Sequence, residues 1–132
     1  MATITNAELT ITTDRPQDRA NVVVSCDVQF TEVEVNAMNM LGLQYTLHCK
    51  ILNKEMLDED PVESFHHQTF PRIPGGAMRY EHVVFDSSTA MSNLHESVFG
   101  KDKLVAELKL KNEETGATVV QRTEVIAADL AA

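Results

Sequence analysis

The chain has 132 residues, of which 43% are hydrophobic, and this is enough apolar material for the core of a single domain over residues 1–132. Disordered chains combine low hydrophobicity with high net charge, so the composition argues against disorder. The 11 Lys and Arg against 20 Asp and Glu give a net charge of −9, which argues against binding to nucleic acid or an anionic membrane, because both require clustered positive charge.

The first predicted strand covers residues 2–13, which are rich in Thr and Ile. Ile4 lies out of phase with Leu9, and this predicts a bulge or a bend near Asn6 and Ala7. Residues 14–18 contain a proline and two aspartates and predict a turn.

Two segments show a clean alternation of apolar and polar side chains. Residues 20–31 and 43–52 both follow this period of two, which predicts strands with one face on a core and the other toward water. The apolar positions of these strands are Val22, Val24, Cys26, Val28 and Phe30, then Leu43, Tyr45, Leu47, Cys49 and Ile51.

Residues 32–42, between these strands, lack a clean period. We interpret them as a strand with a bulge at Ala37 and Met38, or as a loop that interrupts a strand. An exposed edge or loop here would present an adaptable apolar patch to a partner protein, and a core edge is the alternative. The candidate interface residues are Val33, Val35, Met38, Met40 and Leu41.

The middle of the chain contains a predicted loop at 53–61, with a helical turn at 54–57 as an option. A strand is expected at 62–70, and the prolines and glycines of 71–76 indicate a break. Residues 77–86 predict a further strand.

One short helix is predicted at about 88–99. Its start can be capped by the side chain of Asp86, Ser87 or Ser88, and Gly100 is placed to end it. The apolar residues at helical spacing are Met91, Leu94 and Val98.

The C-terminal part predicts a hairpin. Residues 103–111 alternate, residues 112–116 form a loop that ends in Gly116, and residues 117–126 return as the partner strand. Residues 127–132 are expected to fray.

About seven strands with one helix predict an all-β fold, an antiparallel two-sheet β-sandwich of immunoglobulin-like architecture. The likeness is one of architecture alone, since the chain has no Trp for the Cys-Trp-Cys pattern of true immunoglobulin domains. A closed β-barrel is the alternative. We expect a cytoplasmic protein, because the sequence shows no signal peptide and no membrane span, although a chain from which a signal had been removed would look the same.

The two cysteines both fall on the apolar phase of their strands, which predicts buried free thiols. A disulfide between neighbouring strands is the alternative. His66 and His67 are expected to point to opposite faces of a strand, so that they cannot share a site. A zinc site that joins one of them to His82 and a nearby glutamate is disfavoured against histidines at the surface.

Loop carboxylates suggest a calcium site, because calcium takes six to eight oxygen ligands. The candidate ligands are Asp58, Glu59, Asp60 and Asp86. The sequence has no Asp-x-Asp-x-Asp-Gly loop, so a solvated acidic loop is the simpler interpretation.

No motif specifies a catalytic centre or a cofactor, and we name no catalytic residue. The favoured hypothesis is a non-catalytic protein-interaction or assembly module, with self-association into a homodimer as its commonest form. The alternative is a domain that binds calcium or a small ligand through loop carboxylates, and an enzyme is the least favoured class.

Overall fold

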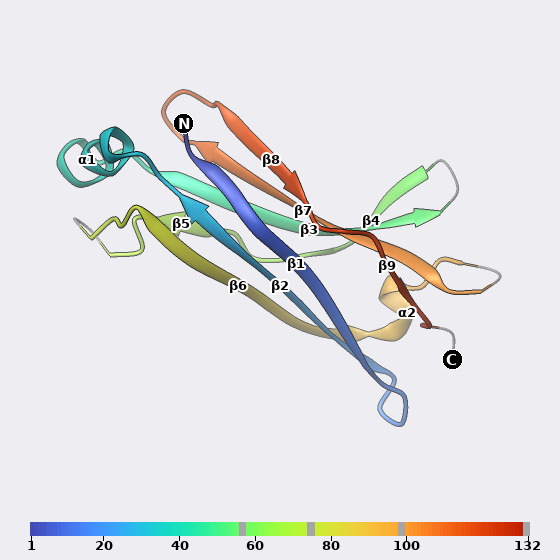
Figure 1. Ribbon diagram of the computed structural model, residues 1–132. Coiled ribbons are helices and arrows are strands. Elements are labelled where there is room, and N and C mark those ends of the chain that lie inside the picture. Colours follow the sequence, from blue (N-terminus) through green and yellow to red (C-terminus); the bar gives the residue numbers. More distant parts are fainter. Residues whose placement is uncertain (56–57, 74–75, 98–99, 131–132) are drawn as a thin grey trace.

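The computed structural model describes residues 1–55, 58–73, 76–97 and 100–130, and in these residues two antiparallel sheets form a sandwich (Figure 1). The all-β sandwich is confirmed, and the alternative of a closed barrel is wrong for the part of the chain that the structure describes. The smaller sheet contains, in spatial order, β1 (Thr3–Asp14), β2 (Arg19–Gln29) and β6 (Tyr80–Ala90).

The larger sheet is built around the long pair of β3 and β7. Strands β4 and β5 pair with β3, while β8 and β9 pair with β7. In chain order these strands are β3 (Tyr45–Glu55), β4 (Asp58–Ser64), β5 (Gln68–Phe70), β7 (Asp102–Asn112), β8 (Thr118–Arg122) and β9 (Ile126–Ala128). The two helices are α1 (Glu32–Leu41) and α2 (Met91–Leu94).

The core lies between the sheets, and the two clean alternations of the sequence face each other across it. All the even-numbered side chains of β2 point inward, and their exposure is 1% or less. They meet the inward side chains of β3 and β7 in one cluster, which includes Leu47, Cys49, Ile51, Leu104, Ala106, Leu108 and Leu110. The predicted bulge in β1 is also confirmed, because the register with β2 shifts between Thr5 and Glu8 and Asn6 has a φ of 52°.

Segment 32–42, predicted as an irregular strand or a loop, is the helix α1, and that prediction is wrong. Thr31 caps the helix: its hydroxyl accepts a hydrogen bond from the Glu34 amide at 3.2 Å, and the Glu34 carboxylate accepts one from the Thr31 amide at 2.8 Å. This reciprocal capping box satisfies two amides that the first turn leaves without partners. Gly42 ends the helix in the left-handed conformation with a φ of 73°.

The helix predicted at 88–99 is wrong for most of its described length. Ser88, Thr89 and Ala90 belong to β6 and pair with β2 as far as Arg19. Only residues 91–94 are helical, with Met91 and Leu94 buried, and residues 95–97 are irregular. The long pairing of β6 with β2 outweighs the local tendency of the serines to cap a helix. The predicted end of the helix, at residues 98–99, lies outside the described residues.

The middle strands also differ from their predicted bounds. Strands β3 and β4 continue into the predicted loop at 53–61 through pairs such as Asn53 with Asp60, and Lys54 is in a strand, not in a helical turn. The strand predicted at 62–70 is split into β4 and β5 by residues 65–67. The described residues therefore contain nine strands instead of about seven.

The carboxylate of Glu34 joins α1 to both sheets. Its Oε2 atom accepts hydrogen bonds from the Ala2 amide at 3.1 Å, beside β1, and from the hydroxyl of Tyr45 in β3 at 2.8 Å. Burial opposes ionisation of Glu34, but the hydrogen bonds from Thr31 and Tyr45 hold its pKa below the usual value. The same carboxylate thus caps the helix and closes one end of the sandwich.

We predict that Glu34→Ala lowers the free energy of unfolding by about 2 kcal/mol, because three hydrogen bonds lose their acceptor at a partly buried site. The measurement is denaturant unfolding followed by circular dichroism. Glu32→Ala, an exposed position in the same helical turn, is the control and is expected to cost about 0.5 kcal/mol or less. Equal losses in the two variants would contradict the linking role of Glu34.

Candidate functional site

The residues predicted as an interface divide between the two faces of α1. Val33, Met40 and Leu41 are exposed, with 77%, 81% and 83% of their surface accessible. Met38 is buried, and Val35 packs partly buried against the core. The helical period explains the split, because Val33 and Met40 are seven residues apart and share one face, while Met38 lies on the other.

Three further apolar side chains, which sequence reasoning missed, are exposed near this helix. They are Ile73, Met78 and Tyr80, and 61% to 70% of each is accessible. The Ala77 amide donates a hydrogen bond to the Asn39 side chain at 2.9 Å, which ties the segment that carries them to α1. We call the set Val33, Met40, Leu41, Ile73, Met78 and Tyr80 the apolar end.

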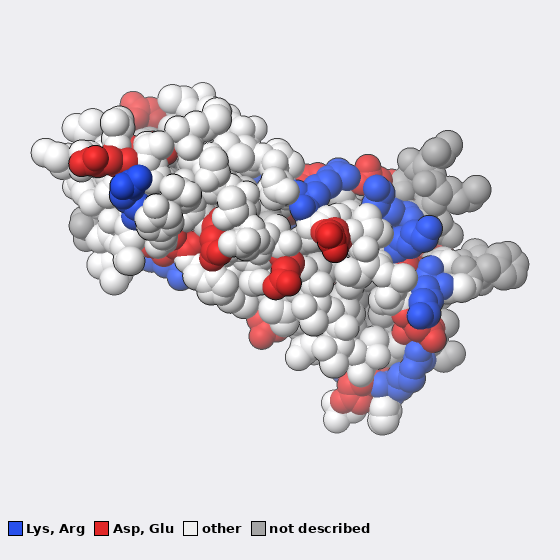
Figure 2. Space-filling model, viewed as in Figure 1, with Lys and Arg blue, Asp and Glu red and all other residues white. Residues whose placement is uncertain are grey.

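The apolar end lies at one extremity of the sandwich. Figure 1 shows α1 and the connection that leads into β6 side by side there. On the face seen in Figure 2, the surface around α1 is mostly white, which marks residues other than Lys, Arg, Asp and Glu, whereas many Lys and Arg side chains gather at the opposite end. A sequence signal existed for Ile73 alone, because it lies inside the Pro- and Gly-rich segment 71–76, where a break places side chains at the surface.

The predicted calcium ligands are not brought together in the described residues. Glu59 and Asp60 belong to β4 in the larger sheet, while Asp86 belongs to β6 in the smaller one. Glu59 instead forms an ion pair of 2.6 Å with Arg122. Among the described residues no group of three or more His, Cys, Asp or Glu side chains is placed to hold a metal ion. The side chain of Asp58 lies outside the described part of the chain, and calcium binding stays a prediction that no contact among the described residues favours.

A buried carboxylate organises the opposite end of the sandwich. The side chain of Asp102 is fully buried and accepts hydrogen bonds from the amides of Glu96 at 2.8 Å and Ser97 at 2.7 Å. Two side chains complete its surroundings: the amide of Asn53 at 3.0 Å and Nδ1 of His95 at 2.6 Å. Burial disfavours the charged carboxylate, but these hydrogen bonds outweigh burial and lower the pKa of Asp102.

The pairing of His95 with Asp102 resembles part of a catalytic triad, but its contacts explain it as a structural clamp. The carboxylate gathers two consecutive backbone amides, and Asn53 also donates to the carbonyl of Leu94 at 2.9 Å. All these contacts hold the chain between α2 and β7 against β3. No observation in the described residues places a nucleophile beside the imidazole of His95.

The adjacent histidines lie differently from their prediction. Residues 65–67 connect β4 to β5 outside any strand, so His66 and His67 do not alternate in direction. Their rings stack, with centroids 4.7 Å apart, and the ring of His67 lies 5.5 Å from that of His48 in β3. The prediction that these two side chains point to opposite faces is therefore wrong.

The two cysteines are buried free thiols, as predicted. Cys26 is in β2 and Cys49 in β3, so they belong to opposite sheets. Burial raises the pKa of Cys26 to about 11 and that of Cys49 to about 12. Both thiols are therefore protonated at neutral pH and are poor nucleophiles.

Comparisons with known proteins give no family for this chain: no protein-family model and no curated protein matches it. Neither helix in the described residues has the length and apolar composition that crossing a bilayer requires. The surfaces and sites of the structure are therefore the basis for its function.

We predict that Asp102→Asn lowers the free energy of unfolding at pH 7 by about 3 kcal/mol. The reason is that the asparagine lacks the negative charge and one of the two acceptor oxygens that the buried carboxylate offers to its donors. The pKa of Asp102 is lower in the folded state, so its contribution is fully present above the unfolded value near 4 and is lost as the pH falls through the folded value. The difference between wild type and variant should stay constant from pH 7 to 5 and shrink below pH 4. Denaturant unfolding at several pH values measures it.

Asp60→Asn is the control for this experiment, since Asp60 is an exposed carboxylate of β4. We expect it to change the stability at pH 7 by about 0.5 kcal/mol or less. A difference for Asp102→Asn that does not vary with pH would contradict an ionised role of this carboxylate.

We predict that a thiol reagent at pH 8 modifies the folded protein at least about 100-fold more slowly than the unfolded chain, because burial raises the pKa of both thiols far above 8. In denaturant, two thiols per chain should react without a reducing agent. A chain that shows no reactive thiol when unfolded would contradict the free-thiol assignment and support a disulfide.

Proposed function

We propose that this protein is a non-catalytic assembly module that pairs with a second copy of itself through the apolar end. The observation that supports the proposal is the concentration of exposed apolar side chains at one extremity. Of the ten large hydrophobic residues exposed in the described part of the chain, six belong to the apolar end. Single exposed apolar residues are ordinary on soluble proteins, but several of them on two segments that lie together at one end are typical of an interaction site.

The composition of the apolar end favours contact with another protein surface. It includes two methionines and one tyrosine, and these residue types are enriched in the cores of protein interfaces. The flexible methionine side chains adapt their shape to a partner. Polar residues of α1, such as Glu32, Asn36 and Asn39, supply a rim around them.

A second copy is the occupant that the geometry of α1 fits best. Val33 and Met40 lie on one face of the helix at its two ends. Two copies related by a twofold axis can therefore place their α1 helices antiparallel, with Val33 of each against Met40 of the other. Such a contact is self-complementary, as closed dimers require.

The exposed edge of β6 is partly blocked by side chains, which favours pairing through the apolar end over the addition of a strand to this edge. On β6, the carbonyl oxygens of His82 and Val84 accept hydrogen bonds from the side chains of Arg72 at 3.2 Å and Gln68 at 3.2 Å. Groups that an added strand would need are thus occupied along this edge. We therefore favour helix-mediated dimerisation over the addition of a foreign strand to β6.

We predict that the wild-type protein approaches twice its chain mass of 14.7 kDa as concentration rises, and that Met40→Ser with Leu41→Ser stays at the monomer mass. The reason is that both side chains are more than 80% exposed, so the variant loses apolar contact in the dimer and little in the monomer. Multi-angle light scattering over a wide concentration range is the measurement.

Val125→Ser is the matched control, because Val125 is also an exposed apolar residue but lies outside the apolar end. It should dimerise like the wild type, and both variants should keep the wild-type melting behaviour of the monomer. A wild type that remains monomeric at all concentrations, or a control that loses the dimer equally, would contradict the proposal.

A further inference from the structure

The outer face of the larger sheet carries a groove that is distinct from the apolar end. Its volume is about 440 Å³, within the range of small-molecule sites. The polar residues that line it are His48, Lys50, Ser64, Glu107, Lys109 and Lys111. Three of the six lysines of this acidic chain therefore lie in a single groove.

The lysines of the groove are not equivalent. Lys50 forms an ion pair of 3.6 Å with Glu107, which also binds Arg122 at 2.8 Å. Lys109 and Lys111 have no carboxylate within ion-pair distance among the described residues. They are two residues apart on β7, which puts their stems about 7 Å apart on the same face of the sheet.

Beside Lys109, the neighbouring parts of the chain place histidines and not carboxylates. His48 pairs directly with Lys109 across the strands, and its ring lies 5.5 Å from the ring of His67. Desolvation, followed by His67 and Lys109, lowers the pKa of His48, although Glu113 acts in the opposite direction. The cationic side chain of Lys109 therefore faces an imidazole whose protonation is disfavoured, and not a carboxylate.

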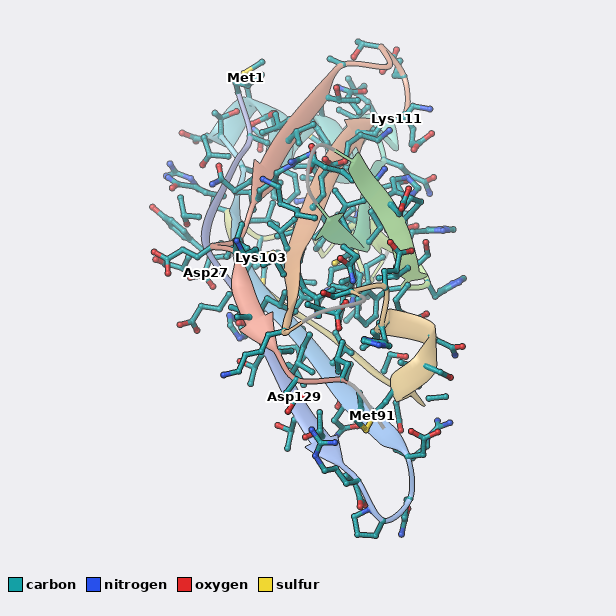
Figure 3. All side chains as sticks on the ribbon, turned by 90° about the vertical axis from the view of Figure 1, so that its right-hand side faces the viewer. Met1, Asp27, Met91, Lys103, Lys111 and Asp129 are labelled. Carbon is teal, nitrogen blue, oxygen red and sulfur yellow. The ribbon has the colours of Figure 1, made fainter. Side chains whose placement is uncertain are left out.

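Acidic side chains limit the positive region at both ends. Along the outward phase of β7 and the loop after it, the order is Glu107, Lys109, Lys111 and Glu113. A long polyanion such as nucleic acid would meet these carboxylates and be repelled, whereas a small anion fits between them. Figure 3 shows Lys111 on the side of the molecule opposite Asp27, which belongs to the outer face of the smaller sheet.

We propose that this groove binds a small multivalent anion, a compound with two or more carboxylate or phosphate groups, which spans the ammonium groups of Lys109 and Lys111. The Nζ atoms supply charge-assisted hydrogen bonds to two anionic groups of one ligand. The hydroxyl of Ser64 and the imidazole of His48, both in the groove, offer further polar contacts. This function is independent of pairing through the apolar end.

The simpler explanation for these lysines is that they only solvate the outer face of the sheet. Under that explanation, any two exposed lysines at the same spacing on β7 would contribute equally to the weak attraction of an anion. The chain offers this comparison, because Lys103 in β7 and Lys101 directly before this strand are both exposed, two residues apart and outside the groove.

The test is a titration of the full chain with inorganic pyrophosphate and, separately, with citrate, followed by NMR amide shifts and by calorimetry at low ionic strength. We expect saturable binding of at least one anion, with shifts on β3 and β7 around His48 and Lys109. Binding of pyrophosphate alone would show that the groove recognises phosphate groups, and binding of citrate alone would show that it recognises carboxylates. Binding of both would show that charge and spacing determine the recognition.

Lys109→Gln with Lys111→Gln should weaken the binding by about tenfold or more, because two charge-assisted contacts are lost. Lys101→Gln with Lys103→Gln removes the same charge at the same spacing and should change it by less than about twofold. His48→Gln is a second groove variant, with an intermediate loss expected.

Three results would overturn the proposal. They are the absence of saturable binding for both anions, equal losses in the two double-lysine variants, and tighter binding of polyglutamate or an oligonucleotide than of the small anions. The last of these would contradict the limit that Glu107 and Glu113 set on the length of the ligand. Because the substitutions are at outward positions, the melting temperatures of all variants check that each remains folded.

Discussion

The apolar contact between the inward face of β2 and the facing side chains of β3 and β7 determines the rest of this structure. Every inward position of β2 from Ala20 to Val28 is almost completely buried, and so are Leu47 and Leu108 on the opposing strands. A side chain of this size contributes roughly 1.5–3 kcal/mol when it leaves water, so the contact fixes the register of both sheets. With the inward phase committed to the core, only the outer faces and the two ends of the sandwich remain for function.

Each end of the sandwich is closed by a carboxylate. At the end formed by α1, Glu34 accepts hydrogen bonds from backbone amides next to β1 and α1 and from Tyr45 of β3. At the opposite end, Asp102 accepts two backbone amides together with Asn53 and His95. In both cases an ionised acceptor satisfies the amides of an irregular segment, because no neighbouring strand reaches these amides. Closure of the first end holds α1 with Met38 inward and leaves Met40 and Leu41 exposed.

Period-two alternation in the sequence predicted the sandwich because the strands of this chain cover one core from two sides. The same rule failed at α1, where apolar residues at 33, 35 and 37 suggest a strand. The correct signal was the pair Thr31 and Glu34, followed by Gly42, which together mark the two ends of a helix. The helix predicted at 88–99 failed for a related reason. At α1 the capping residues were overlooked, whereas before α2 the serines were interpreted as a helix cap although they belong to β6.

The contacts of the candidate sites were harder to predict, because they depend on pairs far apart in the sequence. The three exposed residues of α1 were named in advance, but the segment that carries Ile73 and Met78 is joined to α1 by a hydrogen bond of Asn39 with Ala77, 38 residues apart in the chain. Likewise, the stacking of His66 on His67 follows from a break between β4 and β5 that no local pattern marks.

Net charge is a property of the whole chain and does not determine the sign of the charge on any one surface. The groove of the larger sheet illustrates this. The overall charge of −9 argues against binding to long polyanions, and the carboxylates at both ends of the groove agree with that argument at the local scale. Between them, the outward phase of β7 places two lysines in succession, and the register with β3 puts His48 beside Lys109. The alternation that buries Leu108 and Leu110 necessarily turns Lys109 and Lys111 to the outer face. The strand that completes the core therefore also determines where this acidic protein is locally positive.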